Sequence, residues 1–171
     1  YLSSGFGAPA TGVQIRYDDG SAAAWSERFA ALTERYDAAA DVRIGAAIHS
    51  VRAVPRADLP TVVATAAGRP LHVHLSEQVA ENAGCLEAYG CTPTELLAEA
   101  GALTDRTSLV HATHLTDGDI AKIGAAAAYA CFCPTTERDL GDGIGPSREL
   151  DAAGARLTLG SDSHAIVDPF E

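Results

Sequence analysis

Pro70-Leu-His-Val-His-Leu-Ser-Glu-Gln78 is the stretch of the sequence that decides the fold. Its aliphatic residues alternate with His72, His74 and Ser76, and a short run of this period is typical of a buried strand. Alternation would place these three polar side chains on one face. Glu77 follows at the point where the strand should end. A lone histidine on an apolar strand is more often a hydrogen-bonded core residue than a ligand, so a functional site requires partners from other strands.

Strands and helices are expected to alternate along the whole chain. Four further apolar runs indicate strands, at residues 42–48, 108–114, 125–133 and 155–164. Apolar periodicity predicts helices at residues 22–40 (with Ser21 as N-cap), 56–67, 79–89, 94–100, 116–123 and 146–153, whereas the glycine-rich stretches 1–21 and 134–145 are expected to be loops. This alternation is typical of βαβ units and predicts a parallel sheet.

Ionisable side chains follow four of the five expected strands. His49 and Arg52 come after the first strand, Glu77 after the second, His111 within the end of the third, and Asp162 at the end of the fifth. Strand ends converge on one site when a parallel sheet closes into a barrel. We therefore predict an α/β fold, a (β/α)8 TIM barrel of which this chain supplies about the last five βα units. An open doubly wound sheet with a ligand crevice is the alternative.

Composition excludes several classes of partner. The 12 Lys and Arg against 23 Asp and Glu give a net charge of −11, which argues against nucleic acid or an anionic membrane as partner. No signal peptide or membrane span is visible, so a cytoplasmic protein with a small-molecule substrate is expected, and a homodimer is left open. The chain lacks Met, which suggests a segment of a longer protein. The cysteines are expected to be reduced thiols, although Cys131 and Cys133 could form half of a metal site: Cys85, Cys91, Cys131 and Cys133.

The chemistry is expected to lie with His74, Glu77, His111 and Asp162. Two imidazoles and two carboxylates can supply ligands for one divalent cation, with zinc as the expected metal, and groups that move protons. Zinc usually has at least three protein ligands, whereas the strong candidates are only His74 and Asp162. His111 would bind the cation or position a water molecule. The chain alone therefore contains one or two ligands too few for a complete zinc site.

Three strand ends carry a resemblance to a known group of enzymes. They are His72-Val-His-Leu-Ser-Glu-Gln78, Leu109-Val-His-Ala-Thr-His114 and Leu159-Gly-Ser-Asp-Ser-His164. The sequence resembles the amidohydrolase superfamily of metal-dependent barrel hydrolases, in which histidines on the fifth and sixth strands and an aspartate on the eighth surround the metal. The resemblance matches these positions to His74, His111 and Asp162. It implies that residues 1–171 are a partial catalytic barrel without the first strands and their metal ligands.

Within this superfamily the sequence is most similar to the N-formimino-L-glutamate deiminases of histidine degradation. The likeness includes the opening residues 1–6 and two specific motifs, His49-Ser-Val-Arg-Ala-Val54 and Cys133-Pro-Thr-Thr-Glu-Arg-Asp-Leu-Gly-Asp-Gly-Ile144. It implies that His49 and Arg52 bind the glutamate part of the substrate. A guanidinium also suits a carboxylate on chemical grounds, because its fork pairs with both oxygens.

The resemblance implies a hydrolytic deimination in which Asp162 accepts a proton from water, Glu77 carries protons to the leaving nitrogen, and His111 orients the attacking oxygen.

Each residue also has a structural interpretation: Arg52 as a solvated cation, Glu77 as a helix N-terminal carboxylate, Asp162 as a cap and His111 as a core histidine. The remaining strand histidines are expected to be supporting or structural: His72, His114 and His164. A nucleobase or other amine deaminase, and an inactive fragment or binding module, remain alternatives.

Overall fold

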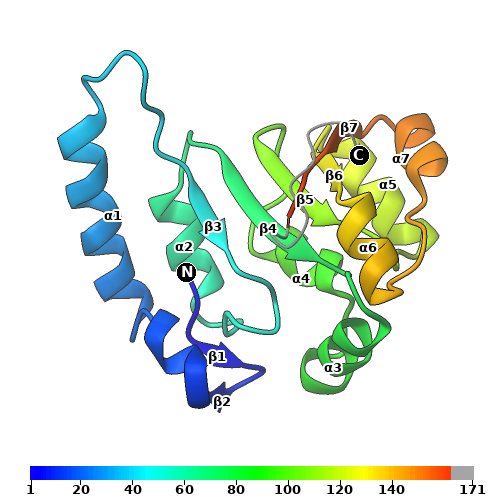
Figure 1. Ribbon diagram of the computed structural model, residues 1–171, viewed down its shortest axis with the longest axis horizontal. Coiled ribbons are helices and arrows are strands. Elements are labelled where there is room, and N and C mark those ends of the chain that lie inside the picture. The colour runs from blue at the N-terminus through cyan, green and yellow to red at the C-terminus, as the bar shows by residue number, and fades with distance from the viewer. Residues whose placement is uncertain (163–171) are drawn as a thin grey trace.

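The computed structural model describes residues 1–162, so His164 and the last part of the fifth expected strand lie outside the described residues (Figure 1). The elements in chain order are β1 (Ser4–Gly5), β2 (Ala8–Pro9), the 3-10 helix η1 (Gly12–Tyr17), α1 (Ala22–Tyr36), β3 (Ala46–Ile48), α2 (Leu59–Thr65), β4 (Leu71–Leu75), α3 (Val79–Tyr89), α4 (Pro93–Glu99), β5 (Thr107–His111), α5 (Asp117–Ala125), β6 (Tyr129–Phe132), α6 (Pro134–Leu140), α7 (Ser147–Ala153) and β7 (Arg156–Leu159).

The five expected strands form one parallel sheet in the order β3-β4-β5-β6-β7. Each strand therefore pairs with the next one along the chain, and the order does not reverse as it does at the switch point of a doubly wound sheet. Sequential parallel strands joined by helices are the arrangement of an α/β barrel wall. Figure 1 shows α1 and α2 beside the β3 side of this sheet and α5 and α7 beside the β7 side.

The two faces of the sheet differ in burial. Along β4, Leu71, Val73 and Leu75 are buried, whereas His72 is exposed and His74 half-buried. The buried face packs under the helices in a core that includes Ile48, Leu75, Leu96, Leu109, Ile123 and Leu150. The register pairs Leu75 with His111, so the carboxyl ends of β4 and β5 lie side by side. The sheet thus brings together the strand ends on which the sequence places its ionisable residues.

Helix caps explain several boundaries. The Ser21 hydroxyl accepts the Ala24 backbone N–H at 3.1 Å, as expected for the start of α1. Thr116 caps α5 in the same way. Gly90 ends α3 with a φ of 73°, a left-handed conformation that glycine adopts without a side-chain clash. No helix among residues 1–162 is long and apolar enough to cross a membrane.

Two predicted loops are wrong. Residues 1–21 contain the β1–β2 hairpin and η1, and the hairpin is held by hydrogen bonds from the Ser3 and Phe6 N–H groups to the Ala53 and Arg52 carbonyls. Residues 134–145 contain α6, which begins at Pro134 because proline fits the first turn of a helix. The strands are also shorter than predicted.

Candidate active site

The strand ends bend sharply at the positions that carry polar side chains. Ser76 follows β4 with a φ of 49°, His111 and Ala112 end β5 with φ values of 72° and 50°, and Asp162 follows β7 with a φ of 51°. Non-glycine residues rarely adopt positive φ, and such strain tends to persist where the surrounding structure fixes a functional geometry. Ser76 is fully buried, whereas His72 is exposed and His74 half-buried, so alternation groups it with two residues whose surroundings differ from its own.

His74 presents one ring nitrogen to the site. Its Nδ1 lies 2.7 Å from the His49 carbonyl oxygen, which can only accept, so Nδ1 carries the proton and donates. In the neutral ring Nε2 then has a free lone pair. A backbone carbonyl that fixes the tautomer in this way is the usual support of a metal-binding imidazole. The geometry therefore prepares His74 Nε2 to act as a ligand.

His111 is oriented by a buried carboxylate that the sequence did not assign. Glu137, in the first turn of α6, accepts the Cys133 backbone N–H at 2.7 Å through Oε1, and the same oxygen lies 3.3 Å from His111 Nδ1. Nδ1 therefore donates to Glu137, and Nε2 lies on the side of the ring away from Glu137. Only 1% of His111 is exposed, and its ring stacks on that of His74 with a centroid distance of 5.7 Å.

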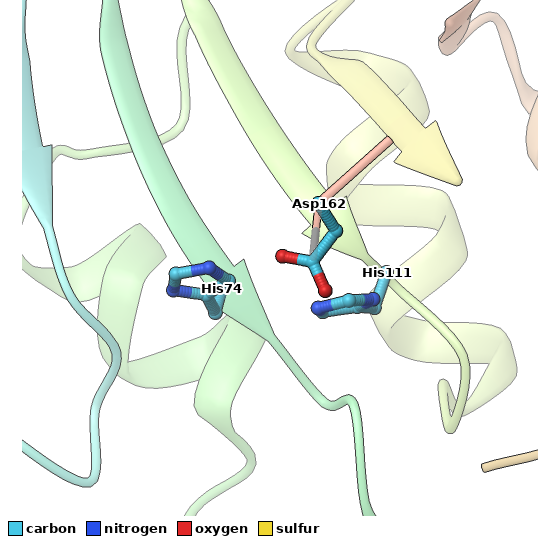
Figure 2. A group of neighbouring side chains, drawn as sticks. All are labelled: His74, His111 and Asp162. Carbon is cyan, nitrogen blue, oxygen red and sulfur yellow. The ribbon is translucent and has the colours of Figure 1, made fainter. Parts of the chain in front are cut away.

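His74, His111 and Asp162 form one group at the ends of β4, β5 and β7 (Figure 2). One ligand atom from each lies within 4.8 Å of the others. Two imidazole nitrogens and a carboxylate oxygen are a donor set that suits zinc, and this spacing is close to what ligands of one cation have. The fixed tautomer of His74 is a further observation that fits a divalent cation. The residues present therefore fit part of a metal site.

Glu77 stands beside this group and links it to Arg52. Its Oε1 lies 3.7 Å from His111 Nε2, and its Oε2 lies 3.2 Å from Arg52 Nη2. The Glu77 backbone N–H donates to Oε2 of Glu81 at 3.2 Å. Glu77 is therefore held between a histidine of the ligand group and a guanidinium, which is a suitable place for a group that moves protons.

His49 and Arg52 line a cavity of about 390 Å³ on the side of the site that faces η1. The His49 ring lies 5.2 Å from the His74 ring, measured between centroids. Burial lowers the pKa of His49 to about 4, and the nearby His74 and Arg52 add to this effect. Near neutral pH His49 is therefore an uncharged hydrogen-bonding group, and Arg52 is the cation of this cavity.

All four cysteines are free thiols. Cys133 forms a second buried group with His111 and Glu137 whose ligand atoms also lie within 4.8 Å of one another. In this group the Glu137 oxygen is already satisfied by two donors, the Cys133 N–H and the His111 ring. Hydrogen bonding thus accounts for the arrangement, and Cys131-Phe-Cys133 does not extend the ligand group of Figure 2.

The profile of the amidohydrolase family matches residues 4–170, nearly the whole chain. The chain belongs to the amidohydrolase family. An amidohydrolase from Brucella melitensis superposes on 99% of the chain with a TM-score of 0.89 and 34% sequence identity, and its matched part is 38% of that protein. The five-stranded parallel sheet is accordingly part of a TIM barrel of the metal-dependent hydrolase type, as predicted.

Two further relatives carry more specific names. The formimidoylglutamate deiminase of Pseudomonas aeruginosa is 38% identical over the full chain, which spans 38% of that protein. An adenosine deaminase from Xanthomonas campestris, solved with bound zinc, has a TM-score of 0.79 and 26% identity, with 84% of this chain and 33% of that one covered. These amidohydrolases are deaminases that act on C–N bonds, and the chain spans about two-fifths or less of their length.

The structure brings all six predicted residues of the amidohydrolase site into one continuous cluster. His49, His74, His111, Glu77 and Arg52 follow one another through ring or ion-pair contacts, and Asp162 completes the group of Figure 2. His72 points to the open face of the sheet and is not in this group. The sequence reasoning missed Glu81 and Glu137. Their sequence signals are only those of helix first-turn carboxylates, and their contacts arise from tertiary packing.

Proposed function

We propose that this amidohydrolase catalyses the metal-dependent hydrolytic deimination of N-formimino-L-glutamate to N-formyl-L-glutamate and ammonia. One observation carries the proposal: Arg52 lines a cavity and also contacts Glu77, the residue beside the ligand group, at 3.2 Å. A substrate held at Arg52 by a carboxylate would present its formimino end to His74, His111 and Asp162. The likeness to the P. aeruginosa deiminase over the full chain supports the same substrate.

His74 and Asp162 would hold the metal in this proposal, with zinc the expected ion and His111 adjacent. A bound divalent cation lowers the pKa of a coordinated water molecule and polarises the substrate, so hydroxide becomes available near neutral pH. The groups of this chain that would bind the metal are the His74 Nε2 lone pair and the Asp162 carboxylate. Further ligands, if the site follows the family, come from outside the described residues.

The chain's own residues then have distinct tasks. Asp162 accepts a proton from the attacking water at a carboxylate oxygen, and His111 Nε2 orients that water. The water oxygen adds to the formimino carbon, and both protons of the water reach the terminal nitrogen, one by way of Asp162 and the other by way of Glu77. The C–N bond to that nitrogen then breaks, and ammonia leaves. The carbon keeps the water oxygen as a formyl group, so the balance is R–NH–CH=NH plus H2O giving R–NH–CHO plus NH3. His49 and Arg52 bind the glutamate part.

A nucleobase or nucleoside deaminase is the second candidate, supported by the likeness to the Xanthomonas adenosine deaminase. Such an enzyme would use the ligand group and Glu77 in the same way, but its substrate would offer no carboxylate to Arg52.

An inactive fragment is a third candidate, and we expect residues 1–171 alone to bind zinc weakly and to turn over no substrate. A cytoplasmic location and the absence of nucleic-acid and membrane partners belong to this proposal.

The test uses the product of the complete gene, loaded with zinc, in water enriched in ¹⁸O. N-formimino-L-glutamate should release ammonia and yield N-formyl-L-glutamate that carries one solvent oxygen in its formyl group. Chelation of the metal should abolish the reaction, and Glu77→Gln should lower kcat at least about 100-fold. Ammonia release without N-formyl-L-glutamate, or no release from this substrate, would refute the proposal.

A further inference from the structure

Glu81 is a buried carboxyl group to which the proposed mechanism assigns no task. It lies in the first turn of α3 with 1% of its surface exposed. Its Oε2 accepts the Glu77 backbone N–H, while its Oε1 has no hydrogen-bond partner among the described residues. Burial raises the pKa of Glu81 to about 7, and the attraction of Arg52 acts against this rise. Keeping a carboxylate here is unfavourable for the fold, which suggests a functional reason.

Arg52 stands between Glu81 and Glu77. Its Nη2 lies 3.2 Å from Glu77 Oε2, and its Nε lies 3.9 Å from Glu81 Oε2. Nε is buried and has no hydrogen-bond partner among the described residues. Two nitrogens of the guanidinium therefore have different carboxylate neighbours: Nη2 contacts the proton-carrying Glu77, and Nε lies nearest to Glu81.

Binding of the substrate carboxylate and the contact with Glu77 compete for the Arg52 guanidinium. A substrate carboxylate that pairs with the Arg52 fork requires the Nη groups, and Nη2 is engaged by Glu77. A carboxylate that pairs with both Nη groups would compete with Glu77 for Nη2, and where it replaces Glu77 it frees a Glu77 oxygen for proton transfer. During this exchange the remaining contact of the guanidinium is that of Nε with Glu81.

We propose that Glu81 is a positioning residue that holds Arg52 at Nε while the carboxylate of a glutamate-like substrate replaces Glu77 at Nη2. Substrate recognition and the release of Glu77 are then one event. This inference rests on the proposed function, because it needs a substrate that bears a carboxylate. It gives a specificity role to the buried Arg52 Nε, which has no hydrogen-bond partner among the described residues.

The first arm of the test is binding of N-formyl-L-glutamate, measured by calorimetry at about pH 8, where Glu81 is ionised. The complete gene product is compared with Glu81→Gln and with Glu87→Gln, an exposed carboxylate on the same helix. Glu81→Gln should weaken binding about tenfold or more, and Glu87→Gln less than about twofold. In an Arg52→Lys background, Glu81→Gln should add less than about twofold, because Glu81 acts through Arg52.

The second arm compares kcat and KM for N-formimino-L-glutamate and for N-propylformamidine, which has no carboxylate. Glu81→Gln should raise KM for the first substrate with little change in kcat, and should leave kcat/KM for the second unchanged. Arg52→Ala should turn over N-propylformamidine faster than the wild type, because Glu77 is then permanently free of Nη2.

The two arms separate the inference from the function on which it rests. Equal binding in Glu81→Gln and Glu87→Gln, or no binding to the wild type, overturns the role of Glu81. A slower or unchanged reaction of N-propylformamidine in Arg52→Ala overturns the release of Glu77. If the wild type binds N-formyl-L-glutamate but releases no ammonia from either substrate, the proposed reaction fails, and the binding arm still decides whether Glu81 anchors Arg52.

Discussion

Replacing Glu81 by glutamine should stabilise the protein at about pH 8 by about 3 kcal/mol. Burial raises the pKa of Glu81 from 4.5 to about 7, and each pKa unit corresponds to about 1.36 kcal/mol. A carboxyl group with a raised pKa binds more protons in the folded than in the unfolded protein between pH 4.5 and about 7. Its contribution to stability therefore falls as the pH rises through this interval and stays low above it.

The assay is urea denaturation of the wild type, Glu81→Gln and Glu87→Gln from about pH 4 to 8. Other groups titrate in the same range, including His49, whose pKa is lowered to about 4, but their contributions cancel in the difference between variants. The advantage of Glu81→Gln should be near zero at about pH 4, grow to about pH 7 and then level off, whereas Glu87→Gln should show no pH trend. A difference that does not vary with pH, or a wild type more stable than Glu81→Gln at about pH 8, would refute the reasoning.

Three further predictions follow from the geometry. His74→Ala should lower zinc affinity at least about tenfold in a competitive chelator titration, whereas His72→Ala, on the same face of β4 but outside the ligand group, should not change it. Glu137→Gln should lower kcat about 10- to 100-fold with little change in KM, because it loosens the ring of the adjacent histidine; an unchanged kcat would contradict this. Gly124→Ala should destabilise the protein by about 2 kcal/mol or more in denaturation, because the new Cβ would lie 2.1 Å from an α7 carbonyl oxygen. The control Gly118→Ala, whose new Cβ would meet no atom closer than 3.7 Å, should change the free energy of unfolding by less than about 0.5 kcal/mol.

The sequence predicted the sheet and most of the cluster for a simple physical reason. Parallel strands align their carboxyl ends, so a polar residue that follows an apolar run is carried to the same rim as its counterparts. This places His74 beside His111 through the Leu75–His111 register. Glu77 and Asp162 reach the same rim because they lie two and three residues beyond the ends of β4 and β7.

The parts that were missed depend on contacts that sequence patterns do not encode. The stretch 134–145 contains enough glycine to indicate a loop, yet Pro134 and the hydrogen bond from the Cys133 N–H to Glu137 allow α6 to form. Glu137 and Glu81 are both first-turn carboxylates, which usually need no explanation beyond the helix dipole. Only packing turns the first toward His111 and buries the second beside Arg52. Alternation also failed at Ser76, where a positive φ ends the strand pattern.

In the proposed function Arg52 selects a substrate with a carboxylate for a hydrolytic site of the amidohydrolase type. The most direct measurement is kcat/KM for ammonia release from N-formimino-L-glutamate, guanine and cytosine by the zinc-loaded product of the complete gene and by its Arg52→Ala variant. We expect release from N-formimino-L-glutamate alone and a loss of at least about 100-fold in kcat/KM in Arg52→Ala. Release from a nucleobase alone, at a rate that does not depend on Arg52, would contradict it.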